Sequence, residues 1–197
     1  MNHLSFGELF EEARTGGKSL AQGEFLFQKG AASTHLYTVL EGCVRMVRFT
    51  STGDPIIMHT ARSGDGLAEA SLFFDTYHCD AEAVLPSTVA CYDKKRIVAI
   101  IGASPQKSLA CIAFFSRQVR SLRALLEVRS IRSARDRVLH YLMLQAAPEN
   151  MTVRISGSIK DMAHDLAMAH ETLYRILANL EKEGKISRDI GIIKIHH

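Results

Sequence analysis

The spacing of apolar residues changes at Pro105, and this change separates two kinds of structure along the chain. Between residues 20 and 95, glycines separate short β-prone runs: "FLFQ", "LYTVL", "CVRMVRF", "PIIMHT", "AEAVL" and "TVACYD". Strands this short, with turn signals every ~8–12 residues, are typical of an antiparallel barrel or jelly roll. In "CVRMVRF" apolar residues, the last of them Phe49, are interrupted by two arginines, which predicts one buried and one wet face.

Beyond Pro105 the apolar residues fall at alternating steps of three and four, which is the spacing of a heptad seam. The members of this seam are Ile112, Phe115, Val119, Leu122 and Leu126. A helix over 105–130 would carry an apolar stripe too long for one small barrel to cover. We therefore expect two copies of the chain to pair through this helix; the alternative is that the stripe packs only on its own barrel.

Residues 131–197 show the order helix, strand, two helices and hairpin. The predicted elements are the helix "SARDRVLHYLMLQAA" that ends before Pro148, the strand "MTVRIS", two helices joined by "LAMA", and a hairpin around Asp189, Ile190 and Gly191. This is the order of a winged helix-turn-helix. The predicted fold class is α+β: an N-terminal double-stranded β-helix, or jelly roll, over 1–104, a long dimerisation helix over 105–130, and a C-terminal winged helix-turn-helix over 131–197.

The second of the two paired helices is amphipathic. Leu173, Ile176, Leu177 and Leu180 share one face, and the polar residues of the first two turns are His170, Glu171, Thr172, Tyr174 and Arg175. In the helix before it, Ser158 stands three residues ahead of Asp161, an arrangement close to a capping box. Two helices that cross at a short turn expose the first turns of the second, where side chains reach base edges in a major groove.

The side chains on this polar face suit the recognition of DNA. Arg175 has two donors for guanine O6 and N7, and Glu171 can accept from cytosine N4. Thr172 or Ser158 could bond a phosphate oxygen. The alternative is an ordinary solvated helix face, which contains similar residues.

Three segments of the sequence resemble parts of a known family. The segment "SIKDMAHDLAMAHETLYRILANLEKEGKIS" is similar to the DNA-binding module of the Crp/Fnr transcription regulators, and "LAQGEFLFQKGAASTHLYTVLEGCVRMV" and "GDGLAEASLF" are similar to parts of their cyclic-nucleotide-binding β-roll. The resemblance covers nearly the whole chain. It implies a homodimeric, cytoplasmic regulator that binds a palindromic site in double-stranded DNA, has RNA polymerase as a further partner, and is not an enzyme. His170 stands where the family's recognition helix usually has Arg, and Ala169 where a Ser cap is usual.

The departures from the family concern the effector. By this resemblance the effector pocket would include Glu69, Ser71, Cys79 and Asp80. Members that bind cyclic AMP have a Gly-Glu pair and, further on, an Arg that neutralises the phosphate, whereas this chain has Ala68 before the Glu and Cys79-Asp80 in place of Arg-Ser. An extra carboxylate beside an anion is unfavourable, so we predict no binding of cyclic AMP or cyclic GMP by the usual clamp. No cofactor is predicted; haem, another small effector, or none at all stay open.

Other functions were weighed against this one. The four cysteines, Cys43, Cys79, Cys91 and Cys111, lack the spacing of a zinc site; they are expected to be free thiols, and a redox role stays open. His35 and Glu41 echo the metal motif of cupin enzymes, but Tyr37 stands where a second His is needed, so no metal site is predicted. The alternatives to a regulator are a β-roll interaction protein that does not bind DNA and, behind it, a cupin-type metalloenzyme.

Charge and hydropathy add two expectations. The formal net charge is +3, with acidic residues in excess over 1–104 and basic residues in excess after it, which suggests an anionic partner for the C-terminal part. No apolar run approaches the ~20 residues that cross a bilayer. The N-terminal residues lack the order of a signal peptide, and the expected compartment is the cytoplasm, without a membrane.

Overall fold

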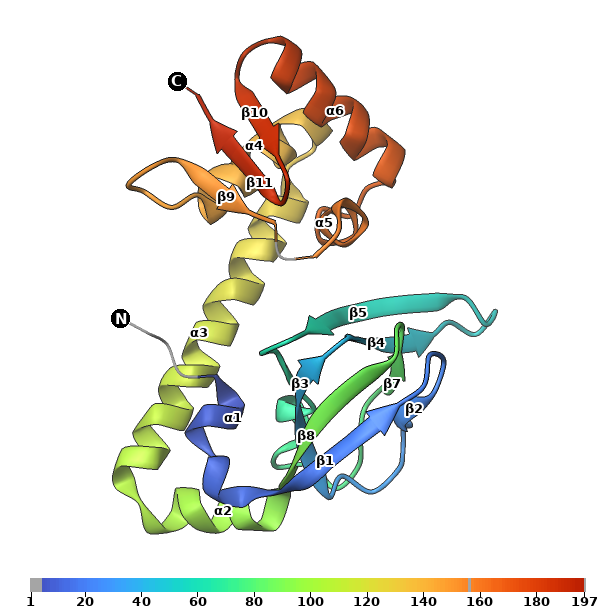
Figure 1. Cartoon of the computed structure of the whole chain (residues 1–197), viewed down its shortest axis with the longest axis vertical. Helices are drawn as coiled ribbons and strands as arrows, with labels where there is room; N and C mark the ends of the chain where they lie inside the picture. Colours follow the sequence, from blue (N-terminus) through green and yellow to red (C-terminus); the bar gives the residue numbers. More distant parts are fainter. Residues whose placement is uncertain (1–4, 156, 197) are drawn as a thin grey trace. The chain divides into compact units, whose positions relative to one another are not determined.

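A computed structural model describes residues 5–155 and 157–196 of the chain (Figure 1). The chain divides into two compact units, Met1–Phe115 and Ser116–His197. The boundary between the two units falls within the longest described helix, α3 (Pro105–Ser130).

The first unit contains two four-stranded antiparallel sheets and short helices. Its elements are α1 (Phe6–Leu9), the 3-10 helix η1 (Glu11–Ala13), β1 (Arg14–Leu20), β2 (Phe25–Phe27), β3 (His35–Glu41), β4 (Cys43–Phe49), β5 (Pro55–Arg62), β6 (Gly66–Leu67), η2 (Glu69–Ser71), β7 (Asp80–Ala83), β8 (Ser87–Asp93) and α2 (Lys94–Ala103). The strand orders are β1-β8-β3-β6 and β2-β7-β4-β5. The predicted strands are all present, in a mixed α/β fold with antiparallel sheets.

Two apolar clusters stabilise this unit. The first takes residues from both sheets, among them Tyr37 and Val39 of β3, Val44 of β4 and Val89 of β8. The second packs α1, α2 and the start of α3 against β3 and β8, with Phe6 and Ile97 buried in it. Because alternate residues of a strand point to opposite faces, β3 and β8 contribute to both clusters and have no wet face.

One detail of the predicted pattern in β4 is wrong. The pairing of β4 with β5 shifts register between Met46 and Val47. The extra residue lies in β5, because Met46 pairs with His59 and Val47 with Ile57, while the pairing of β4 with β7 is regular. Met46 and Val47 are both buried, whereas Phe49, at the end of the strand, is 52% exposed.

The second unit combines the end of α3 with three helices and one small sheet. Its elements are α4 (Ala134–Gln145), β9 (Thr152–Arg154), α5 (Ile159–Asp165), α6 (His170–Lys182), β10 (Ile186–Asp189) and β11 (Ile192–Ile195). The predicted order of helix, strand, two helices and hairpin is confirmed, although Ser156 of the predicted strand lies outside the described residues. The antiparallel sheet has the order β10-β11-β9, and the hairpin turns at Ile190 and Gly191.

No single helix in the described ranges is long and apolar enough to cross a membrane; α2 and α3 pass that test of length and composition only as a pair, with a bend of 116° between them.

The turn between α5 and α6 contains a strained residue. Ala167 has a φ of 49°, in the left-handed region that favours glycine. We expect Ala167→Gly to raise the free energy of unfolding by about 1 kcal/mol, because it removes the clash of Cβ with the backbone. Urea unfolding measures the change. Ala178→Gly, at an exposed interior position of α6, is the control and should lower the stability by about 1 kcal/mol; a loss for both variants would contradict the strain at Ala167.

Candidate nucleic-acid interface

Helix α6 has one face in the core and one in solvent. Leu173, Leu177 and Leu180 are fully buried in the core of the second unit. On the other side Tyr174 is 48% exposed and Arg175 is exposed as well. The apolar face fixes the helix, so the polar side chains of its first two turns are presented outward.

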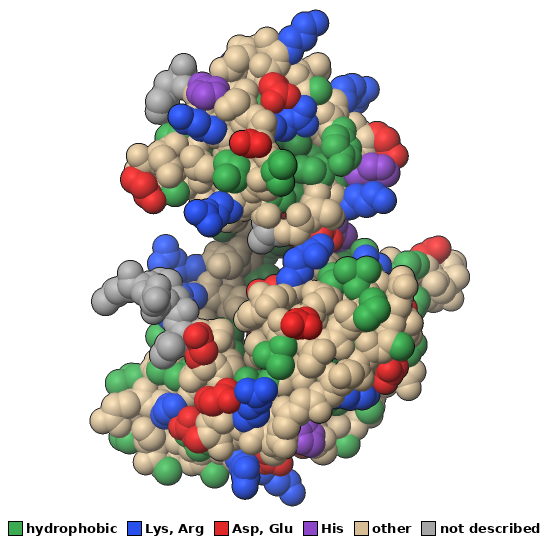
Figure 2. All heavy atoms as spheres, in the orientation of Figure 1, with side chains coloured by type: hydrophobic (Ala, Val, Ile, Leu, Met, Phe, Trp, Pro, Cys, Tyr) green, Lys and Arg blue, Asp and Glu red, His purple; other side chains and the backbone are tan. Residues whose placement is uncertain are grey.

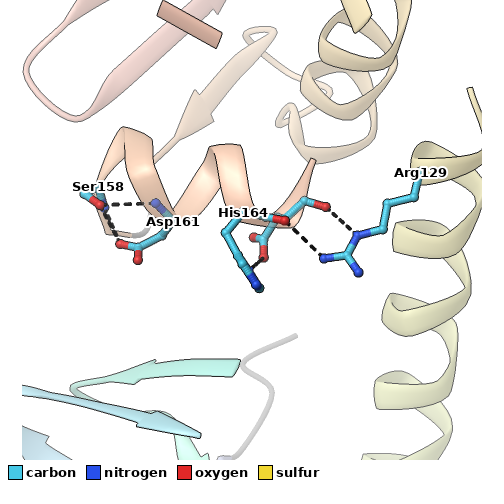
Figure 3. Close-up of polar contacts among 5 residues, drawn as sticks. Arg129, Ser158, Asp161 and His164 are labelled. Carbon is cyan, nitrogen blue, oxygen red and sulfur yellow. Dashed lines mark hydrogen bonds and ion pairs between the residues drawn. The ribbon is translucent and has the colours of Figure 1, made fainter. Parts of the chain in front are cut away.

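Helix α5, which precedes the turn into α6, is capped as the sequence predicted. The backbone N–H of Asp161 donates to Ser158 Oγ at 3.2 Å, and the backbone N–H of Ser158 donates to Asp161 Oδ2 at 2.8 Å (Figure 3). The Ser158 hydroxyl donates its proton to the same carboxylate oxygen at 2.7 Å. Since a serine has only one hydroxyl proton, Ser158 has none left for a phosphate oxygen in this arrangement.

His170, Glu171 and Tyr174 contact one another at the start of α6. His170 Nε2 lies 3.0 Å from Glu171 Oε1. The His170 ring also meets the edge of the Tyr174 ring, with 6.4 Å between centroids. Ala169 provides no side-chain cap, as the sequence indicated. From the sequence these residues are expected to act as separate donors and acceptors, but in the structure Glu171 already has a partner within the chain.

Arg175 and Thr172 differ in their availability. Among the described residues, Arg175 is exposed and makes no hydrogen bond or ion pair with the rest of the chain. Thr172 is partly buried at the side of the helix. Arg175 is therefore the side chain of this face with the most unused donors.

The hairpin β10–β11 is tied to the far end of α6. Arg188 Nε and Nη2 donate to Glu181 Oε2 at 2.9 Å and 2.6 Å, and the Arg188 backbone N–H donates to Glu181 Oε1 at 3.1 Å. This side-chain bond lowers the pKa of Glu181. The hairpin tip projects beyond the contact, with Ile190 96% exposed. This pair could not be predicted from the sequence, because the two residues belong to different elements.

The charge on this unit is mixed. In Figure 2 basic side chains are scattered over the visible face of the unit, with acidic ones between them. On this face, attraction to a polyanion would therefore come from separate basic side chains.

The four residues assigned to an effector pocket lie in two segments. Glu69 and Ser71 belong to η2, where Ser71 is buried and its carbonyl accepts a hydrogen bond from Ser33. Cys79 is buried, and burial raises the pKa of its thiol to about 11. Asp80 Oδ1 accepts a hydrogen bond from the Lys29 backbone N–H at 2.7 Å. The Asp80 carboxylate therefore has a partner within the chain and stabilises the turn after β2.

Glu69 gives this segment a dependence on pH. Burial, together with the nearby Asp65, raises the pKa of Glu69 from 4.5 to about 7. The folded protein then holds a proton at pH values where the unfolded chain has lost it, so the free energy of unfolding falls as pH rises from about 4.5 to about 7. We expect Glu69→Gln to remove this part of the pH dependence in urea unfolding. Glu41→Gln, at an exposed position of β3, should leave it in place; an unchanged profile in Glu69→Gln would contradict the assignment.

The residues that echoed a cupin motif have other contacts. The Tyr37 and Tyr77 hydroxyls lie 3.4 Å apart in the core, and His35 Nδ1 lies 3.0 Å from Thr34 Oγ1. In the described part of the chain, no group of three or more His, Cys, Asp or Glu side chains is placed to hold a metal ion. None of the four cysteines forms a disulfide within the described residues.

The predicted dimer seam lies along α3. Ile112, Val119, Leu122 and Leu126 are exposed by 61%, 45%, 60% and 63%. Phe115 differs, since it is partly buried and its ring meets those of Phe6 and Phe114. Four of the five seam residues are thus exposed apolar side chains along α3: Ile112 in the first unit, and Val119, Leu122 and Leu126 in the second.

Comparison with known proteins agrees with this arrangement. Residues 17–104 match the family described as the cyclic nucleotide-binding domain. The chain is 26% identical over 176 residues to the transcriptional regulator LdrP of Thermus thermophilus, covering 86% of this chain and 87% of LdrP. It is 26% identical over 191 residues to the nitrogen fixation regulation protein FixK of Bradyrhizobium diazoefficiens, covering 93% and 80%. The structure of FixK2 from Bradyrhizobium japonicum superposes with a TM-score of 0.70 at 20% identity, covering 93% of both chains.

The chain has a β-rich unit that matches cyclic nucleotide-binding domains and, after it, a unit with a helix that exposes a polar face. This combination, together with the named relatives, defines the class of two-part DNA-binding transcriptional regulators. Within that class, these similarities support a regulator of the Crp/Fnr type.

Proposed function

We propose that this Crp/Fnr regulator binds duplex DNA as a homodimer, with the first two turns of α6 in the major groove of each half-site. The observation that carries the proposal is the division of α6 into a fully buried apolar face and an exposed polar one that begins directly after a four-residue turn. A helix held in this way can approach base edges without disturbing its own core.

The side chains of the polar face have distinct roles in this proposal. Arg175 donates to guanine O6 and N7, and Thr172 bonds a phosphate oxygen. Glu171 accepts from cytosine N4 in competition with His170, so these two residues act as one unit with the ring of Tyr174 beside them. Ser158 acts by capping α5, which fixes the turn that leads into α6.

The proposed domains follow from these roles. We assign residues 1–104 to a sensory β-roll, that is a double-stranded β-helix or jelly roll, and 105–130 to the dimerisation helix. Residues 131–197 form a winged helix-turn-helix in which α5 and α6 are the paired helices and β10–β11 is the wing. The exposed stripe of α3 supports pairing with a second copy.

The two-fold symmetry of such a dimer determines the form of its target. Two copies of α6 about 34 Å apart would contact half-sites one helical turn from each other, so the site is palindromic. Among the relatives, the protein anr of Pseudomonas aeruginosa is named a transcriptional activator. We therefore propose RNA polymerase as a further partner and the cytoplasm as the compartment.

Selection of bound sequences from random duplex DNA tests the proposed function. We expect an enriched palindrome with half-sites separated by one turn, and protection of both half-sites in a footprint. If no duplex is bound even at low salt, where phosphate contacts are strongest, the chain is instead an interaction protein whose helical unit mediates assembly.

We predict no response to cyclic nucleotides. The pocket segment offers Glu69, whose pKa burial raises to about 7, and the carboxylate of Asp80, and Cys79 stands where relatives that bind cyclic AMP have an arginine. Titration of the protein with cyclic AMP or cyclic GMP in a calorimeter should release no binding heat at micromolar ligand. Binding at that concentration would show that another cation replaces the missing arginine.

A further inference from the structure

Two arginines bind the C-terminal end of α5. Arg129, in the last turn of α3, donates from Nε to the Asp165 carbonyl at 2.8 Å and from Nη2 to the His164 carbonyl at 3.2 Å (Figure 3). Arg137, in α4, donates from Nη1 to the Leu166 and Ala167 carbonyls at 2.9 Å and 3.4 Å. Four consecutive carbonyl groups thus accept hydrogen bonds from guanidinium groups that come from other helices.

These bonds suit the end of a helix. The last carbonyls of a helix lack partners within it and carry a partial negative charge, which cations stabilise. The turn that follows contains Ala167 in its left-handed conformation and leads directly into α6. The geometry of the turn, and with it the direction in which α6 starts, is therefore determined partly by side chains outside α5 and α6.

Arg137 also connects this turn to the segment after α3. Its Nε and Nη2 donate to the Ile131 carbonyl at 3.0 Å and 2.8 Å. Arg129 lies two residues before Ile131, at the end of α3. Two guanidinium groups thus join three segments: the end of the proposed dimerisation helix, the residues that follow it, and the turn before α6. Neither arginine needs to contact DNA for this role.

We propose that Arg129 and Arg137 are positioning residues for DNA recognition, which couple the end of α3 to the turn that orients α6. The inference rests on the proposed contact of α6 with DNA. Arg129 is the more informative of the two, because it is exposed at the surface and uses two nitrogens of one planar fork. A lysine at this position keeps the charge but does not reproduce the fork.

The test compares Arg129→Met with Arg132→Met on a selected DNA site. Arg132 lies three residues further on, is exposed, and makes no hydrogen bond within the described residues, so both variants lose one charge from the same segment. We expect Arg129→Met to weaken specific binding about tenfold, within the range of mutations that alter coupling without touching a ligand. Arg132→Met should stay within about twofold of the unchanged protein, and Arg129→Lys should recover only part of the loss.

Two further readouts separate positioning from other roles. The slope of log affinity against log salt should be the same for Arg129→Met and Arg132→Met, whereas loss of a phosphate contact at Arg129 alone would lower it by about one. Non-specific binding should differ little between these two variants, and urea unfolding should show both folded under the binding conditions. Equal specific affinity of the two variants, or a lower salt slope for Arg129→Met, would overturn the proposal.

The proposed function can fail separately. If Arg175→Ala leaves binding unchanged, α6 is not the DNA-contacting helix and the proposed function is wrong. If Arg175→Ala weakens binding and Arg129→Met does not, only the positioning role is wrong.

Discussion

Leu122→Asp is expected to convert the dimer to monomers and to weaken binding to the two-half-site DNA by about 10²- to 10⁴-fold. The side chain is 60% exposed on α3, between Val119 and Leu126 of the same stripe. In a dimer a carboxylate at this position would be removed from water beside an identical charge from the partner, which is strongly unfavourable. Monomers bind one half-site at a time and lose the effective concentration that links the two contacts.

The oligomeric state is measured by sedimentation or light scattering, and the affinity on one-half-site and two-half-site DNA. We expect the one-half-site affinity to change little, because the substitution is far from α6 in the sequence and lies on an exposed surface. Ser121→Asp is the matched control: it adds the same charge at the neighbouring exposed residue, off the seam, and should remain dimeric. If Leu122→Asp remains a dimer, the exposed stripe of α3 is not the interface.

The periodic parts of the structure could be predicted from the sequence. The helix over 105–130 and the order of elements after it depend on apolar spacing and turn residues, which are local properties. The capping of α5 by Ser158 and Asp161 is equally local, since four consecutive residues contain the whole motif. The buried face of α6 was also predicted, because a helix with four aligned aliphatic residues packs them inward.

Elements without such a pattern were missed. β1 contains Gly16 and Gly17 and is exposed along most of its length, so it shows no alternation that indicates a strand. α2 was not predicted either, although the Asp93 side chain caps it by accepting from the Arg96 backbone N–H at 2.7 Å. In both cases the sequence of the segment only weakly favours its secondary structure, and pairing or packing with distant residues stabilises it.

The candidate site was predicted as a set of residues but not as a set of contacts. Asp80 binds the backbone of Lys29, and Arg129 binds carbonyls that lie more than thirty residues further along the chain. Such contacts depend on which segments the fold brings together. Because every residue has a backbone carbonyl, the residue types do not show which carbonyl accepts the hydrogen bond. The contact of His170 with Glu171 is between neighbours, yet whether two adjacent side chains meet depends on their rotamers.

Arg175→Ala is expected to weaken binding to the selected site and to relax base preference at one position of each half-site. Loss of one bidentate contact costs about 1–3 kcal/mol, and a symmetric dimer loses two. Arg175 is exposed and makes no hydrogen bond or ion pair within the described chain, so the substitution removes donors from the interface without leaving a buried group unpaired. The stability of the second unit, measured by urea unfolding, should therefore change little.

The measurement compares affinities for the selected site and for single-base variants of it. Arg96→Ala, at an exposed position of α2 in the first unit, removes the same charge and should retain the full preference. If Arg175 contacts a base, Arg175→Ala weakens binding only to sites that contain the guanine, and it leaves the salt dependence of binding nearly unchanged. Uniform weakening on every sequence, with the salt slope lower by about one, would instead place Arg175 on a phosphate, and the bases would then be contacted by the unit of His170, Glu171 and Tyr174.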